Sequence, residues 1–429
     1  MNSNYKALVS LWKFPFHNLI HCRTIAKVRL KWVKNRSLDH NIDVHTDIKA
    51  AFLIKNAIIR SPTGYLTSKS LIDSQKLLGI TVPTLRFMRR YPTLFEEYPH
   101  PKYPSLSCFK LTELGMMMHQ KELGVYEQCE GDIVEKLCRV LMMTRSQMLP
   151  FQSLHPLKWD LGLPDDFDRN LIRKYPDHFR VVKGTSGTNC LKLVKWPDEF
   201  SVSLLQKMNE KSIEEGTDGF SLYRGFKRGK AALEFPMSFP RGYGAQKKVK
   251  AWMDDFQKLP YISPYEDSRG IDPNSDIMEK RVVGLLHEFL GLTIYKKTKR
   301  NYLRCLREEF NLPHRFTRIF TRYPGIFYLS LKCKTTSVAL REGYQRGKLV
   351  NPHPLARHRD KVYYLMRTGM IYRGKALDVI PRLDTLVDND AEDAGEEEEE
   401  EEEDDDEEEE IEMSGEDYYS EAENDSGSD

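Results

Sequence analysis

The heptapeptide RRYPTLF at residues 89–95 recurs in altered form as RKYPDHF at 173–179 and as TRYPGIF at 321–327. Such self-similarity indicates one supersecondary unit used three times, which constrains the fold more than any single motif does. Each Tyr-Pro is preceded by an apolar-periodic segment that opens with Asp-Ile, at Asp47, Asp132 and Asp276. The spacings from this Asp to the Tyr are 44, 43 and 47 residues, so the three units share one plan.

Each unit is predicted to contain three helices followed by a β-hairpin. An acidic residue in the first turn favours the helix dipole, and apolar residues at helical spacing follow it. After a leucine-rich second helix, a third is expected to begin near Pro83, Pro164 or Pro313, because proline is tolerated in a first helical turn. Tyr-Pro ends this helix, since proline disfavours helix at the residue before it. β-rich pairs around KGTSGTN and KCKTT then predict hairpins, which is the order of a winged helix.

The third helix of each unit is predicted to have one apolar and one cationic face. Arg315, Arg318 and Arg322 stand at i, i+3 and i+7, which places three guanidinium groups along one stripe of a helix. The comparable residues are Arg86, Arg89 and Arg90 in the first unit and Arg169, Arg173 and Lys174 in the second. A solvated basic face without a ligand is the alternative, and it weakens because the stripe recurs three times. We therefore predict that these residues contact RNA.

Between the second and third units, aromatic residues alternate with Lys and Arg, as in YRGFKRGK and FPMSFPRGYGAQKKVKAWMDDF. Binding of single-stranded RNA uses such a composition, because bases stack on rings while cations follow the phosphates. The predicted RNA contacts in this connector are Lys227, Arg228, Lys230, Lys247, Lys248 and Lys250. The alternative is that the rings of Trp252, Phe256, Tyr261 and Tyr265 only pack the connector against the units.

The charge of the chain is divided between its ends and its body. The formal net charge is +1, but residues 384–429 hold 27 of the 64 acidic residues, which leaves 65 basic against 37 acidic residues elsewhere. This tail cannot bury apolar area and is expected to be disordered, either as a solubilising segment or as an RNA mimic that folds over the cationic body. Before Asp39 there are eight basic residues and no acidic one, the composition of an organelle transit peptide.

Motifs for catalysis are absent from the sequence. HEFLG at His287 lacks the second histidine of a zinc-protease motif, and no P-loop, GxSxG or GxGxxG pattern occurs. The seven cysteines include no CxxC pair, which argues against structural zinc and favours a reducing compartment. No segment reaches the roughly 18 apolar residues that a membrane helix needs. We expect a soluble protein that is not an enzyme and has no metal, no cofactor and no membrane partner.

The predicted fold is α+β and predominantly helical, with three repeated winged-helix-like units of three helices plus a β-hairpin. The predicted parts are a transit peptide at 1–38, the first unit at 39–127, the second unit at 128–196, the basic aromatic connector at 197–275, the third unit at 276–380 and the disordered acidic tail at 384–429.

Four segments, LRFMRRYPTLF, LPYISPYED, EKRVVGLLHEFLGLTIYKK and GIFYLSLKCKTTSVALREGY, resemble the plant organelle RNA recognition (PORR) domain family. The resemblance runs from about Lys31 to Lys375. It implies import into mitochondria or chloroplasts and binding of organellar transcripts, commonly to promote group II intron splicing beside other splicing factors. It implies no enzyme activity or cofactor and supplies no base-contacting residues. The basic, apolar leader with few Ser favours the mitochondrion over the chloroplast.

Two other functions fit the same residues. A winged-helix third helix can enter a DNA major groove, so an organellar DNA-binding or transcription factor is one alternative. Competition between duplex DNA and single-stranded RNA would separate it from an RNA-binding protein. A scaffold that holds splicing or ribosomal proteins is the other alternative, and co-purification of protein partners after nuclease treatment would favour it. The three units contain no code of one repeat for one base, so the transcript cannot be read from the sequence.

Overall fold

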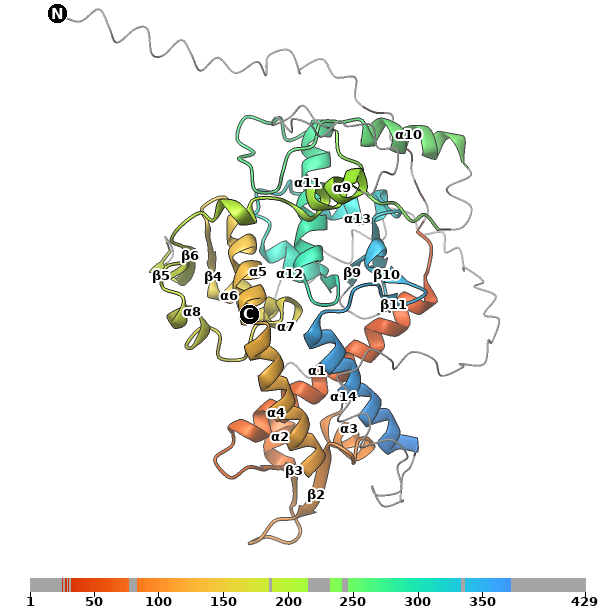
Figure 1. The fold of residues 1–429 in the computed structure, drawn as a ribbon. Coiled ribbons are helices and arrows are strands. Elements are labelled where there is room, and N and C mark those ends of the chain that lie inside the picture. The colour runs from red at the N-terminus through yellow and green to blue at the C-terminus, as the bar shows by residue number, and fades with distance from the viewer. Residues whose placement is uncertain are drawn as a thin grey trace, which may run out of the picture.

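The computed structural model describes residues 32–76, 83–184, 187–214, 232–240, 246–332 and 336–371, together with Ile25, Val28 and Leu30. The protein is α+β, with many helices and small antiparallel sheets (Figure 1). Within the described residues, no helix combines the length and apolar character needed to cross a membrane. The predicted acidic tail at 384–429 and most of the predicted transit peptide lie outside the described residues.

The first unit starts with α1 (Arg36–Arg60), whose first turn is capped by the side chain of Asn35. Its further elements are β1 (Leu66–Thr67), α2 (Ser68–Ser74), α3 (Thr84–Arg90), β2 (Phe95–Pro99) and β3 (Ser107–Leu111). The sheet order is β1-β3-β2, so the short strand before the second helix joins the hairpin that follows the third. A long helix, α4 (Glu113–Gln128), then leads to the second unit.

The second and third units repeat this strand order. The second contains α5 (Glu130–Met142), β4 (Met148–Pro150), α6 (Phe151–Leu154), η3 (His155–Leu157), α7 (Lys158–Leu161), α8 (Leu171–Lys174), β5 (Phe179–Lys183) and β6 (Asn189–Leu193). The third contains α11 (Asp276–Leu292), β7 (Lys297–Lys299), α12 (Arg300–Cys305), η5 (Phe316–Arg318), α13 (Ile319–Arg322), β8 (Phe327–Ser330) and β9 (Ser337–Leu340). The sheet orders are β4-β6-β5 and β7-β9-β8, and all pairings are antiparallel.

Additional elements connect and follow the second and third units. They are η4 (Asp198–Phe200), α9 (Leu204–Glu214), α10 (Lys247–Gln257), η6 (Arg341–Gly343), β10 (Tyr344–Gln345), β11 (Lys348–Leu349) and α14 (Pro354–Ile371). α9 and α10 both lie within the predicted connector, and in Figure 1 they lie close to α11 and α13 of the third unit.

The third helices begin later than the sequence predicts in two of the three units. α3 begins directly after Pro83, as predicted. In the second unit, residues after Pro164 form hydrogen-bonded turns, such as Phe167 N to Pro164 O at 3.2 Å, and α8 begins only at Leu171. In the third unit, η5 and the single α-helical turn of α13 replace a continuous α-helix from Pro313. The prediction that the third helix begins near Pro164 and Pro313 was therefore wrong for these two units, although each third helix is short and ends at Tyr-Pro as predicted.

The described residues form two hydrophobic cores. The larger joins the second unit, the connector and the third unit, while the smaller contains the first unit together with Val362, Leu365 and Met366 of α14. The Thr93 hydroxyl donates to Leu365 O at 2.9 Å, which ties α14 to the end of α3. Figure 1 shows α14 beside α1 and α4, so a helix that the sequence assigned to the third unit packs on the first.

Residues at the end of the predicted transit peptide pack on the third unit. Trp32 Nε1 donates to Leu329 O at 2.7 Å, and the hydroxyl of Tyr328 donates to Asp39 Oδ1 at 2.9 Å. The rings of Trp32 and Tyr328 stack with their centroids 6.4 Å apart. The segment before α1 therefore covers the outer face of the third sheet.

Candidate nucleic-acid interface

In each unit, the tyrosine of the Tyr-Pro motif is hydrogen-bonded to an acidic residue of that unit's first helix. The Tyr91 hydroxyl donates to Asp47 at 2.9 Å, and the Tyr175 hydroxyl donates to Glu130 at 2.9 Å. The Tyr323 hydroxyl donates to Glu279 at 2.8 Å. The two residues of each pair are 44, 45 and 44 positions apart in the chain. Tyr-Pro therefore recurs because the same bond closes each unit between its third helix and its first.

The Asp-Ile repeat contains one of the three acidic partners. Asp47 is the partner of Tyr91, whereas Glu130 and Glu279, and not Asp132 and Asp276, are the partners in the other two units. Asp132 instead pairs with Lys136 at 2.7 Å and His353 at 2.8 Å, and Asp276 accepts from Ile25 N at 2.7 Å. The first turns of α5 and α11 each hold two acidic residues, so the Asp-Ile pattern does not by itself mark the partner, and in α1 the partner Asp47 lies well inside a helix that begins at Arg36.

Burial and these bonds shift the tyrosine pKa values upward. Burial and the bond to Asp47 raise the pKa of Tyr91, and burial and Glu279 raise the pKa of Tyr323 well above its ordinary value. At the more exposed Tyr175, the hydrogen bond to Glu130 is the main cause of the raised pKa. The three hydroxyls therefore stay protonated at neutral pH and act as donors.

The basic residue before each tyrosine has a different environment in each unit. Lys174 Nζ lies 2.8 Å from Glu130 Oε2, and Arg322 Nη1 lies 2.7 Å from Glu279 Oε1. Arg90 instead lies over the ring of Tyr91, 5.6 Å from its centroid, and is exposed. Two of the predicted RNA contacts, Lys174 and Arg322, thus also neutralise the carboxylate that anchors the unit.

The predicted arginine stripe of the third unit does not lie on one α-helix. Arg315 is exposed before η5, Arg318 is the half-buried last residue of η5, and Arg322 ends α13. The i, i+3, i+7 rule assumes 100° per residue, and the 3₁₀ turn breaks that relation. Of the three side chains, Arg315 is the one that the structure leaves exposed.

The corresponding residues of the first and second units are exposed. Arg86, Arg89 and Arg90 project from α3, and Arg89 makes two hydrogen bonds to Glu97 of β2, at 2.8 and 2.7 Å. In the second unit, Arg169 lies in the turns before α8, and Arg173 lies on α8.

Helix α10 presents the lysines that the connector sequence pointed to. Lys247, Lys248 and Lys250 are exposed in its first turn, which contains no acidic residue. Cations at a helix N-terminus interact unfavourably with the helix dipole, so local stability does not explain this placement. A cleft of about 440 Å³ lies beside them, lined in part by Met237, Phe239 and Lys250. The other three predicted contacts, Lys227, Arg228 and Lys230, lie outside the described residues.

Four described aromatic rings of the connector belong to the core, which confirms the packing alternative for these four. Trp252 and Phe256 lie against Tyr323, with ring centroids 5.5 and 4.6 Å away. Tyr261 is fully buried, and Tyr265 is 7% exposed. These four rings hold the connector on the third unit and are not exposed for stacking on bases.

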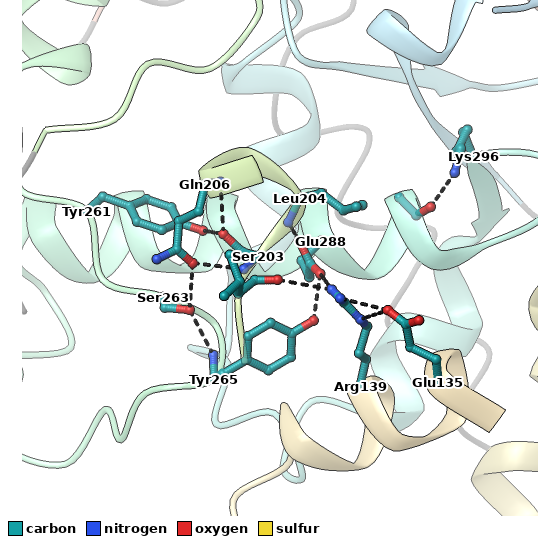
Figure 2. Close-up of polar contacts among 12 residues, drawn as sticks. Glu135, Arg139, Ser203, Leu204, Gln206, Tyr261, Ser263, Tyr265, Glu288 and Lys296 are labelled. Atoms are coloured by element: carbon teal, nitrogen blue, oxygen red, sulfur yellow. Dashed lines mark hydrogen bonds and ion pairs between the residues drawn. The ribbon is translucent and has the colours of Figure 1, made fainter. Parts of the chain in front are cut away.

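A buried polar network joins the second unit, the connector and the third unit (Figure 2). Arg139 of α5 lies 3.3 Å from Glu288 of α11 and 2.7 Å from Glu135. Glu288 also accepts from the Tyr265 hydroxyl and from Leu204 N, both at 2.6 Å. Arg139 and Glu288 are 2% and 1% exposed, so the network orients the basic surfaces of the two units relative to each other.

No group of three or more His, Cys, Asp or Glu side chains within the described ranges is placed to hold a metal ion. The described cysteines Cys108, Cys129, Cys138 and Cys190 are buried free thiols, while Cys305 is exposed.

Comparison with known proteins assigns the chain to a family. The family model of the plant organelle RNA recognition domain matches residues 33–370, which is most of the chain. The protein belongs to the plant organelle RNA recognition family. The matched region starts close to Trp32, where the described fold begins, and ends one residue before the end of α14.

Several relatives match over most of this chain. The Arabidopsis thaliana mitochondrial protein WHAT'S THIS FACTOR 9 is 32% identical over 381 residues, covering 87% of this chain and 95% of the relative. The Zea mays chloroplastic protein WHAT'S THIS FACTOR 1 is 29% identical, covering 82% and 70% respectively. ROOT PRIMORDIUM DEFECTIVE 1 of Arabidopsis thaliana is 30% identical, covering 78% and 83%. No solved structure matches the fold significantly.

Proposed function

We propose that this protein binds RNA in a plant organelle, without catalysing a reaction itself, and promotes the splicing of group II introns. The observation that carries the proposal is the family match over residues 33–370. Exposed cations on separate elements support it, among them Arg86 on α3, Arg173 on α8 and Lys248 on α10. Several basic surfaces on one protein would hold distant parts of a folded intron together, and the RNA would supply the catalysis.

The mitochondrion is the proposed compartment, with the chloroplast as the alternative. The mitochondrial relative is matched over 95% of its length, and the chloroplastic relative over 70% of its own. The basic leader agrees with import. Because Ile25, Trp32 and Asn35 contact the third unit, we propose that any processing of the leader occurs before residue 25.

Each unit is proposed to be a variant of the winged helix. The support is the strand order, in which the strand before the second helix pairs with the last strand of the hairpin in all three units. The Tyr-to-acid bond adds a shared closing contact. With the turns of α8 and α13 so short, we propose that phosphates are contacted by exposed side chains around these turns and not by a helix inserted in a groove.

The proposed RNA contacts differ in how much of their charge is free for a phosphate. Arg86, Arg90, Arg169, Arg173, Lys247, Lys248, Lys250 and Arg315 are exposed and form no ion pair with another described residue. Arg89, Lys174 and Arg322 bond to carboxylates of their own units, and Arg318 is half-buried. The first group is proposed to dominate RNA binding.

The function is tested by measuring the affinity of the full chain for a labelled single-stranded RNA as a function of salt. The slope of log K against log salt is negative, and each lost phosphate contact reduces its magnitude by about 0.7 for a single strand. Replacing Lys247, Lys248 and Lys250 together by Gln should reduce that magnitude by about 2. The control variant, Lys69→Gln/Lys102→Gln, replaces two lysines of the first unit and should change the slope little. Preference for duplex DNA over RNA in competition would contradict the proposal.

A further inference from the structure

The hairpin of the second unit differs in charge from the other two. Residues 179–195 include Arg180, Lys183, Lys192 and Lys195 and no acidic residue. The first hairpin, 95–111, balances its lysines with Glu96 and Glu97. Among the three hairpins, the second therefore carries the strongest field of one sign.

Two of these cations face each other across the strands. Arg180 of β5 is directly paired with Lys192 of β6, and both are exposed. Like charges at directly opposite positions destabilise a β-sheet. Neither side chain has an ion pair or hydrogen bond with another described residue. The chain thus keeps a repulsive pair that its own described residues do not offset.

The equivalent positions of the other units show that the repeat does not require this pair. In the first hairpin the position is Glu96 opposite Lys110, which form an ion pair at 3.2 Å. In the third hairpin it is Tyr328 opposite Ala339, where the segment with Trp32 and Asp39 covers the sheet. Judged by the residues that the structure describes, the second sheet is therefore the one whose outer face is both left uncovered by such a segment and doubly cationic.

We propose that the outer face of the β4-β6-β5 sheet, at Arg180 and Lys192, is an RNA-binding surface that contacts the phosphate backbone. This inference rests on the proposed function and adds a surface that the sequence analysis did not single out. An anion between the two cations offsets their repulsion, and a phosphate group accepts hydrogen bonds from both. Val194, 44% exposed and two residues after Lys192, lies on the same face and offers apolar surface to a ribose or base.

The test compares the full chain with Arg180→Gln/Lys192→Gln in binding to a labelled 20-nucleotide single-stranded RNA over a range of KCl concentrations. Loss of two phosphate contacts should reduce the magnitude of the slope of log K against log salt by about 1.4. The control Lys69→Gln/Lys102→Gln removes the same charge and should leave the slope near that of the unaltered chain. Arg180→Lys/Lys192→Arg retains both charges and should retain the slope.

The outcomes separate this surface from the proposed function. If the unaltered chain binds RNA and Arg180→Gln/Lys192→Gln keeps the same slope, the surface is not an RNA contact, and an acidic protein segment becomes the better occupant. If the unaltered chain shows no salt-dependent binding to RNA, the proposed function fails together with the surface. If the slope falls by the same amount in Arg180→Gln/Lys192→Gln as in the control variant, the fall reflects only the lower net charge of the protein. That result would also overturn the assignment.

Discussion

At the junction of the second and third units, Arg139 lies between Glu135 and Glu288, whereas on the outer face of the second sheet Arg180 stands opposite Lys192. The junction is buried and its charges are partnered, so it serves the architecture. The outer face is exposed and its charges repel, so it is suited to an external anion. We infer that a cation in this protein serves the architecture when its charge has an acidic partner, and is available to a ligand when it has none.

The largest expected effect comes from breaking the junction. Glu288→Ala leaves Arg139 with a charge buried beside a single acidic partner, and it leaves the Tyr265 hydroxyl without its acceptor. Removal of one partner from a buried ion pair costs about 3–5 kcal/mol, and we expect a loss of that size in the free energy of unfolding. Chemical denaturation measures it. A loss below about 1 kcal/mol would show that the network does not hold the units together.

The next largest effect concerns the hydrogen bond between the Tyr-Pro tyrosine and its acidic partner, compared between the third and the second unit. Glu279→Ala removes the acceptor of Tyr323, which is 2% exposed, and the partner of Arg322, so we expect a loss of about 2–3 kcal/mol. Glu130→Ala removes the equivalent acceptor of the more exposed Tyr175, and should cost about 1 kcal/mol or less. Chemical denaturation of both variants measures the difference between the two losses in the free energy of unfolding. Equal losses would contradict the claim that the bond contributes more where the tyrosine is buried than where it is more exposed.

A pH effect of intermediate size is expected at the contact between α14 and the first unit. Burial lowers the pKa of His358 from 6.5 to about 4, although Glu122 acts in the opposite direction and Lys55, Arg359 and Lys361 act with burial. The folded protein therefore keeps this histidine neutral while the unfolded chain binds a proton below pH 6.5. Stability from this group is present above pH 6.5 and is lost as the pH falls toward 4.

The change from pH 7 to pH 5 should lower the free energy of unfolding by up to about 2 kcal/mol through His358. Denaturation at several pH values measures this loss, and His358→Gln should remove most of it. His45 is half-buried and its pKa is also lowered by burial, so the part of the pH dependence that comes from His45 should persist in that variant and provides the comparison. An unchanged pH dependence in His358→Gln would show that His358 is not held neutral.

The smallest expected effect comes from a substitution that gives the second hairpin the pair of opposite charges found in the first. Arg180→Glu places a carboxylate opposite Lys192, as Glu96 lies opposite Lys110. It should raise the free energy of unfolding by about 0.5 kcal/mol while weakening RNA binding. The reverse change, Glu96→Arg, should lower stability by a similar amount. If Arg180→Glu destabilised the protein, the native pair would not be repulsive.

Much of the fold could be predicted from the repeat, because Tyr-Pro ends a helix for local steric reasons and β-rich pairs around turns predict hairpins. The packing of α14 on the first unit could not, since it depends on contacts such as Thr93 with Leu365, which are far apart in the chain. The late starts of α8 and α13, several residues after Pro164 and Pro313, were also missed. Turns after Pro164 and Pro313 are stabilised by backbone hydrogen bonds that an apolar pattern does not reveal.

The candidate site was predictable only in part. The sequence identified Arg86 and Lys248 as exposed cations, but it could not show that Arg322 and Lys174 bond to acidic residues more than 40 positions away. The signal for Arg180 and Lys192 was present as a hairpin without acidic residues. Their significance depends on the strand register, which places them directly opposite each other.

The most direct test of the central claim is crosslinking and immunoprecipitation of the tagged full-length protein from purified organelles, followed by sequencing of the attached RNA. Binding of organellar introns predicts sharp enrichment of one or a few introns, reduced when Arg180 and Lys192 are replaced by Gln. Recovery of DNA, or of protein partners without RNA, would contradict it, as would RNA spread evenly over all transcripts.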